Sequence, residues 1–313
     1  MTTFMKLRDS VRSFFSAHSY WLSTIAKGVM WFICATMINR YLGFSEVLSS
    51  PLIALGLSVF LAFPPMTVGG IVFSAIVLLQ VFSFSRHAAI AVLAIILLAY
   101  IICGIYRCER TEFFIIQPAL HFLGIPFLVP LFTGLFGKAK NGGSVVFSCI
   151  ISWFLKTIQE NSAQLMDSTA PVTMADLLVK EIVSNPMFYV YLAACMAVFV
   201  VSHLLTAIPL DYAWQIAAGA GVMAGFFIGL TGRLFLDRRS GIVPLIISSL
   251  IVAAAGIITS LFFRDLDYSR TEKVRFEDDE YYYYVTAVPK IHVGQEVNEI
   301  KKIKTPEKKG NRR

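Results

Sequence analysis

Long apolar runs separated by short polar breaks fill the chain from about Trp21 to Phe263. The runs Ile71–Leu79, His87–Tyr106 and Gly241–Phe263 contain almost no charged residues. A hydrocarbon core of roughly 30 Å is crossed by a helix of about 20 apolar residues, and this chain supplies such runs repeatedly. The pattern therefore predicts an all-α integral membrane protein that crosses the bilayer many times.

The spacing of the polar breaks predicts a bundle of about eight transmembrane helices plus one proline-broken segment. The predicted spans are Tyr20–Ile38, Val47–Phe63, Val68–Phe84, His87–Tyr106, Gly143–Ile158, Met187–Leu205, Trp214–Leu236 and Gly241–Phe263. Three regions follow: an amphipathic N-terminal segment (1–19), a transmembrane helical domain (20–263) and a short β-containing soluble tail (264–313).

The broken segment, Phe113–Phe136, contains Pro118, Gly124, Pro126 and Pro130. Proline removes a backbone donor and interrupts a helix, and irregular backbone at membrane depth is tolerated only where protein or water satisfies it. We therefore predict two half-helices that meet near Gly124-Ile125-Pro126. Basic residues flank both ends, which favours a re-entrant segment with both ends on one side; a continuous, kinked span is the alternative. The flanking residues are Arg107, Arg110, Lys138 and Lys140.

Composition supports the membrane class, because only 15% of the residues are charged against about 25% in soluble domains. The net charge of +7 is explained by basic residues at span ends and at the C-terminus, so we expect no nucleic-acid partner. Five cysteines, an odd number, argue against a disulfide framework. Cys103 and Cys108 have no neighbouring histidine, and we predict neither a metal site nor a cofactor.

Several polar residues within the apolar block either line a pathway or form hydrogen bonds between helices. They are Gln80, Gln117, His121, Lys156, His203, Gln215 and Arg233. Gln117 and His121 lie one helical turn apart within the broken segment, where broken helices in many transporters hold substrate. The pathway candidates are therefore Gln117, His121, Gly124 and Pro126.

A stripe of small residues, Gly221, Gly225 and Gly229, recurs every fourth position within the predicted span Trp214–Leu236. Glycines at this spacing allow another helix to approach backbone to backbone. We predict that the stripe is a helix-packing surface.

The C-terminal tail combines a tyrosine-rich stretch with a basic end. Consecutive tyrosine and valine residues favour a strand, and a hairpin is predicted near 273–292. A lone hairpin is marginal in water, so this strand is expected to dock onto a protein partner or a second copy. The residues concerned are Tyr281, Tyr282, Tyr283, Tyr284 and Val285. The stretch 299–313, with 7 basic and 2 acidic residues, is predicted to be disordered and attracted to anionic lipid.

No catalytic motif of the HExxH, GxSxG or GxxxxGK[ST] type is present, so we do not expect an enzyme. The leading hypothesis is a non-enzymatic subunit or scaffold of a membrane-bound assembly, docking through the tyrosine-rich strand. The alternative is a small-solute transporter or permease-like protein with its pathway near 113–136. The protein is expected in the cell membrane, in contact with the lipid bilayer, with both termini cytoplasmic.

Overall fold

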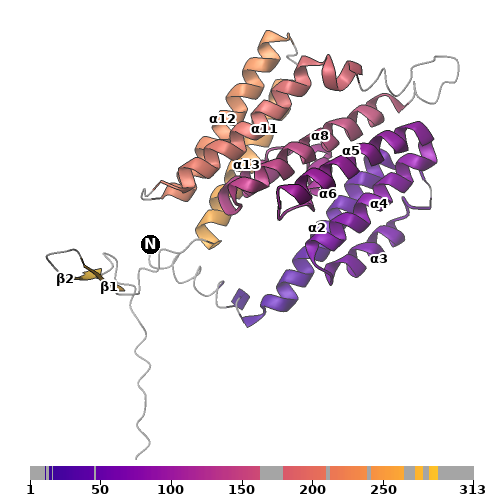
Figure 1. Ribbon diagram of the computed structural model, residues 1–313. Coiled ribbons are helices and arrows are strands. Elements are labelled where there is room, and N and C mark those ends of the chain that lie inside the picture. Colours follow the sequence, from indigo (N-terminus) through magenta and orange to yellow (C-terminus); the bar gives the residue numbers. More distant parts are fainter. Residues whose placement is uncertain are drawn as a thin grey trace, which may run out of the picture. The chain divides into compact units, whose positions relative to one another are not determined.

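A computed structural model of the protein describes residues 11, 14–15, 17–45, 47–162, 179–208, 212–237, 241–263, 272–277 and 282–287. The chain forms two compact units, Ser10–Arg264 and a second made of Met1–Asp9 with Asp265–Arg313. The larger unit contains the helices that the structure describes, and the smaller one contains a β-hairpin (Figure 1). Most of the predicted N-terminal segment 1–19, the stretch 299–313 and Tyr281 lie outside the described residues.

Seven described helices are long and apolar enough to cross a membrane. They are α2 (Ser19–Leu42), α4 (Met66–Phe84), α5 (Arg86–Ile105), α8 (Gly142–Glu160), α11 (Pro186–Thr206), α12 (Ala213–Phe235) and α13 (Ile242–Phe263). Their side chains that face away from the bundle are large and apolar, as lipid contact requires. The protein is thus a multi-pass helical membrane protein.

The predicted count of eight spans is not confirmed at Val47–Phe63. This stretch contains helix α3 (Pro51–Ala62), which has only 12 residues, and a rise of about 1.5 Å per residue makes it roughly 18 Å long. Two local features shorten it. Pro51 occupies the first turn of α3, where proline starts a helix readily, and Pro64-Pro65 follow its end.

Two hydrophobic cores make up the larger unit. The first is built mainly by α2, α3, α4, α5 and α6 (Phe113–Phe122), and the second by α7 (Leu128–Phe136), α11, α12 and α13. Helix α8 belongs to both, since Phe154 and Leu155 lie in the first core while Val145 and Cys149 lie in the second. A short 3-10 turn, η1 (Ala139–Asn141), leads into α8.

Helix α12 lies beside α11 (Figure 1), and the glycine stripe is part of this contact. A Cβ on Gly221 would lie 3.1 Å from Val198 O and would collide with Ser202 Oγ. A Cβ on Gly225 would lie 3.1 Å from Ala194 O and would collide with the Val198 side chain. Gly229 faces α13 instead, where an added Cβ would lie 3.4 Å from the methyl groups of Leu245, an ordinary contact.

The smaller unit contains strands β1 (Glu272–Glu277) and β2 (Tyr282–Ala287), which pair antiparallel. The register places Val274 opposite Val285 and Phe276 opposite Tyr283. The side chains of Tyr282, Tyr284 and Val285 are exposed.

Candidate functional site

The proline-broken segment folds back on itself, so that its two ends lie together. Lys138 Nζ lies 3.0 Å from Glu109 Oε1, and Lys140 Nζ lies 2.7 Å from the same oxygen. The backbone N–H of Glu109 also donates to Asn141 Oδ1 at 2.9 Å. Hydrogen bonds from Lys140 and then Lys138 lower the pKa of Glu109 to about 2, so this carboxylate stays charged at ordinary pH.

The turn between α6 and α7 forms because of local backbone chemistry. Gly124 has φ of +87°, a conformation that costs glycine little. The N–H of Ile125 donates to Leu120 O at 2.9 Å, which closes the end of α6 in the manner of a Schellman cap. Pro126 follows and cannot continue the helix. The predicted break near Gly124-Ile125-Pro126 thus coincides with the turn between the two helices.

Gln117 ties this turn to the second core. Its Nε2 donates to Pro126 O at 2.8 Å and to Tyr191 Oη of α11 at 2.9 Å. The side chain is fully buried, and the Pro126 carbonyl that it satisfies belongs to the irregular backbone of the turn. Gln117 therefore holds the turn in place and does not itself line the neighbouring pocket.

His121 lies at the end of α6 and faces a pocket. Its Nδ1 lies 2.6 Å from Ser152 Oγ of α8, and its ring stacks on Tyr191 with 4.8 Å between the ring centroids. Helices from both cores thus fix this imidazole.

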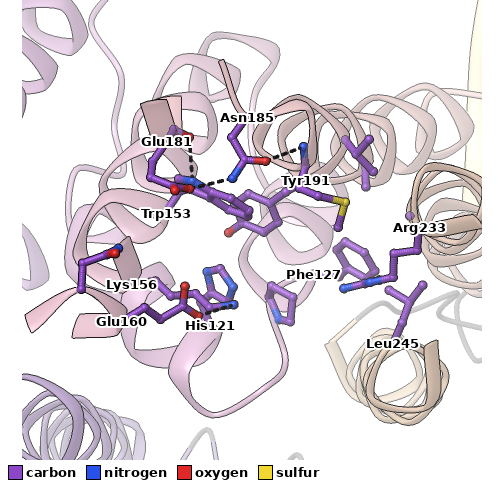
Figure 2. Close-up of a pocket in the computed structure, with 16 residues that line it drawn as sticks. His121, Phe127, Trp153, Lys156, Glu160, Glu181, Asn185, Tyr191, Arg233 and Leu245 are labelled. Atoms are coloured by element: carbon purple, nitrogen blue, oxygen red, sulfur yellow. Dashed lines mark hydrogen bonds and ion pairs between the residues drawn. The ribbon is translucent and has the colours of Figure 1, made fainter. Parts of the chain in front are cut away.

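The pocket has a volume of about 360 Å³ and lies at the turn between α6 and α7 (Figure 2). Side chains of α8, α11, α12, α13 and the short π-helical turn η2 (Val179–Val183) complete it. Its principal lining residues are His121, Pro126, Phe127, Trp153, Lys156, Glu160, Glu181, Asn185, Tyr191, Arg233 and Leu245. Of the predicted pathway residues, His121 and Pro126 line it.

An aromatic wall on one side of the pocket is held by hydrogen bonds. The rings of Trp153 and Tyr191 have centroids 5.6 Å apart. Trp153 Nε1 donates to Glu181 O at 3.1 Å, and Asn185 Nδ2 donates to Glu181 Oε2 at 2.6 Å. Asn185 also caps α11, because its Oδ1 accepts from the N–H of Met187. The carboxylate of Glu181 is therefore fixed at the start of α11.

Charged groups are distributed unevenly around the pocket. Lys156 Nζ lies 3.8 Å from Glu160 Oε1 and 5.9 Å from the centroid of the Trp153 ring. Arg233 enters from α12, on the opposite side from Glu160 and Glu181 (Figure 2). Within the described part of the chain no carboxylate lies within ion-pair distance of Arg233.

Glycines on two elements provide space for the Arg233 side chain. A Cβ on Gly241 would lie 2.8 Å from Arg233 Nε, and one on Gly229 would lie 3.7 Å from a guanidinium nitrogen. The guanidinium thus fits between α12 and the start of α13.

The sequence identified some lining residues but not others. Lys156 and Arg233 were among the polar residues singled out, and both line the pocket with His121. Gln80 instead donates to Asn39 Oδ1 at 2.6 Å, and His203 stacks on Phe199 at 5.8 Å. Sequence reasoning missed Trp153, Tyr191 and Glu181, and no local sequence signal connects these three residues, which only the tertiary fold brings together.

The arrangement offers hydrogen bonds, charges and aromatic surface to a small polar molecule. Among the described residues, no group of three His, Cys, Asp or Glu side chains could hold a metal ion. No family model matches the sequence, and comparisons with curated proteins and with solved structures give no match either.

Proposed function

We propose that this protein is permease-like and binds a small polar solute in the pocket at the α6–α7 turn on its way across the membrane. The observation that carries the proposal is a charged, polar pocket at the turn of a broken membrane segment. Solute sites of many transporters are formed by such discontinuous helices, near the middle of the bilayer.

The dimensions of the hairpin support this position. Helices α6 and α7 have ten and nine residues, so each spans roughly 15 Å, half of a hydrocarbon core of about 30 Å. Their outer ends are joined through Glu109, Lys138 and Lys140. A re-entrant hairpin of this kind would place its turn, and the pocket beside it, near the bilayer midplane.

The charges support access of water to the pocket. Arg233 of α12 lines it with no carboxylate within ion-pair distance among the described residues, and ionisable side chains at membrane depth are expensive unless they pair or face a water-filled cavity.

The first experiment tests whether the pocket is a water-filled path. With the five native cysteines replaced by alanine, Leu245→Cys introduces a thiol that lines the pocket. Val252→Cys is the matched control, seven residues along the same helix, within the second core. A membrane-impermeant thiol reagent should modify position 245 and leave position 252 unmodified. Equal protection of both positions would refute the proposal.

The second experiment tests transport itself. The two variants are reconstituted into vesicles, and uptake of a panel of labelled amino acids, organic acids, amines and sugars is measured. Uptake of at least one solute should exceed that of protein-free vesicles. A bulky thiol reagent should block this uptake in the Leu245→Cys protein and leave it unchanged in the Val252→Cys protein. Uptake that is insensitive to the reagent in both variants would place the path elsewhere.

A scaffold or assembly subunit is the second candidate function, and the exposed face of β2 supports it. The side chains of Tyr282 and Tyr284 are 65% and 72% exposed, and a two-stranded hairpin gains stability when a partner adds a strand. Deletion of 281–291 should then remove co-purifying proteins in mild detergent, while deletion of 299–313 should not. If the first deletion retains the same partners as the intact chain, docking by this strand is wrong.

We further propose a location in the cell membrane with both termini cytoplasmic. This orientation requires α3 to complete a crossing despite its length, with the membrane thinned locally around it. The basic end of the chain supports the assignment, since positive residues favour the cytoplasmic side.

A further inference from the structure

We infer that the solute is a zwitterion of amino-acid size, whose carboxylate binds Arg233 and whose ammonium group faces Glu181. This inference rests on the proposed function, because it assigns a substrate class to the same pocket.

The anionic group of the solute is assigned to Arg233. Its guanidinium lines the pocket and has no carboxylate partner among the described residues. Gly241 and Gly229 make the space that it occupies. A planar guanidinium binds a carboxylate through two parallel hydrogen bonds, so an arginine held in this way suits a ligand carboxylate.

The cationic group is assigned to the opposite side of the pocket. Lys156 and Glu160 lie 3.8 Å apart and offset each other. This leaves Glu181, which has no cationic partner within the described ranges and whose Oε2 is oriented by Asn185. The rings of Trp153 and Tyr191 lie on the same side (Figure 2), and aromatic faces attract ammonium groups.

Opposite charges on two sides of the cavity indicate the class of solute. Arg233 comes from α12 and Glu181 from η2, with the cavity between them (Figure 2). A simple anion would leave Glu181 uncompensated, and a simple amine would leave Arg233 uncompensated. A molecule with both charges satisfies the two groups at once. Apolar side chains that line the remaining wall fit an apolar substituent, and they are Phe127, Met187, Val190 and Leu245.

The test uses matched triplets in which one charge at a time is removed from an amino acid. The probes are leucine with 4-methylpentanoate and 3-methylbutylamine, alanine with propanoate and ethylamine, and phenylalanine with 3-phenylpropanoate and 2-phenylethylamine. Binding to the detergent-solubilised full-length protein is measured at pH 7 by equilibrium dialysis. In at least one triplet the amino acid should bind roughly tenfold more tightly than either analogue, as expected for loss of one charge-assisted hydrogen bond.

Two variants assign the ends of the solute. Arg233→Gln should abolish the preference for the amino acid over its amine analogue, because the guanidinium that binds the carboxylate of the amino acid is gone. Glu181→Gln should abolish the preference over the carboxylate analogue. Arg86→Gln, at the start of α5 and outside the pocket, should retain both preferences. Ratios of affinities are compared, so a partial loss of folded protein does not affect the result.

The outcomes separate the inference from the proposed function. If a carboxylate or an amine analogue binds as tightly as its amino acid in every triplet, the inference that the solute is a zwitterion is wrong. It is also wrong if none of the nine compounds binds while Leu245→Cys is modified by the reagent. In both cases the proposed function of the pocket stands. If Leu245→Cys is protected from the reagent, the proposed function itself is wrong. Exchange of the two variant effects would reverse the assigned orientation and overturn the inference as stated.

Discussion

Gly221 allows α12 to touch the backbone of α11, because a Cβ at this position would collide with Ser202 Oγ and lie 3.1 Å from Val198 O. Gly219, two residues earlier on the same helix, has open space where its Cβ would be. The two glycines therefore differ in what a methyl group would meet, although their sequence surroundings are similar.

Gly221→Ala should destabilise the protein by about 1–3 kcal/mol, the cost of overpacking. Gly219→Ala should be neutral or stabilising by about 0.5–1 kcal/mol, because alanine is the better helix former. Thermal unfolding of both variants in the same detergent measures the difference. Equal effects at the two positions would show that the close approach of α11 and α12 is not needed.

Gln117→Leu removes the hydrogen bonds of the amide to Pro126 O and Tyr191 Oη, and it leaves Pro126 O without its buried donor. We expect a loss of about 1–3 kcal/mol, together with a changed pocket, since the turn loses its tie to Tyr191. Gln80→Leu is the control, because Gln80 pairs with Asn39 away from the pocket. Both variants should be less stable, but only Gln117→Leu should alter the rate at which Leu245→Cys is modified. Equal rates in the two backgrounds would contradict this role.

Only part of the site could be predicted from the sequence. The break at Gly124 and Pro126 was predictable, because it depends on the backbone preferences of adjacent residues. The contact of His121 with Tyr191 was not, since these residues are 70 positions apart in the chain and meet only when α6 and α11 pack. The place of Glu181 in the pocket was not predictable either, since it depends on hydrogen bonds with Trp153 and Asn185.

Among the elements, the α6–α7 hairpin is closed at its base by ion pairs of Glu109 with Lys138 and Lys140. These ion pairs join a residue that precedes α6 to two residues that follow α7. The pKa of Glu109 is lowered, so the folded state favours its ionised form. Its contribution to stability is complete above the ordinary pKa near 4.5 and is lost as the pH falls toward about 2.

Glu109→Gln should therefore lower the thermal midpoint at pH 6, and the difference from the parent protein should shrink as the pH falls from about 4.5 toward 2. The measurement is a series of melting curves in one detergent over this range. Lys140→Gln and the double variant complete the comparison: once Lys140 is removed, Glu109→Gln should have a smaller effect. A difference that stays constant with pH would exclude the ionised carboxylate as the cause.

Helix α3 tests the orientation of the whole bundle. If it completes a crossing, its two ends lie on opposite sides of the membrane. Val47→Cys and Thr67→Cys are exposed positions before and after α3, and in a cysteine-free background an impermeant reagent should label them from opposite sides. Labelling of both from the same side would mean that α3 does not cross, and the termini would then lie on different sides of the membrane.

Elements were predicted from the sequence with mixed success. Seven apolar runs correspond to helices long enough to cross, because continuous apolar sequence of that length has few alternatives in lipid. The helix in the run Val47–Phe63 is shorter than predicted, since hydropathy does not report that α2 ends at Leu42 or that α3 begins at Pro51. Whether 113–136 re-enters or crosses the membrane was left open by the sequence, and the contacts of Glu109 with Lys138 and Lys140 bring its two ends together, which favours the re-entrant alternative.

At the scale of the whole larger unit, the two cores are joined through α8 and the α6–α7 hairpin. Leu155 of α8 is fully buried in the first core, and Val198 of α11 is fully buried in the second. Because α8 contributes to both, we expect the unit to unfold as one cooperative structure.

Leu155→Ala and Val198→Ala should lower the free energy of unfolding by about 2–5 kcal/mol and about 1–3 kcal/mol respectively, from lost packing, and each should lower the thermal midpoint. Leu97→Ala, at a half-exposed position on α5, should have little effect. Fluorescence of introduced probes in α4 and in α12 should report one shared transition. Two separate transitions would show that the cores are independent domains.

The short helices of the α6–α7 hairpin bear on how binding in the pocket would respond to the membrane potential. If the α6–α7 turn lies near the bilayer midplane, as proposed, a charged particle that reaches it crosses about half of the transmembrane potential, and a full passage of one charge involves about 2.3 kcal/mol per 100 mV. Occupancy of Arg233 and Glu181 by an ion with net charge would therefore depend on voltage. Occupancy by a molecule whose charges sum to zero would not, so membrane potential would neither drive it inward nor hold it back.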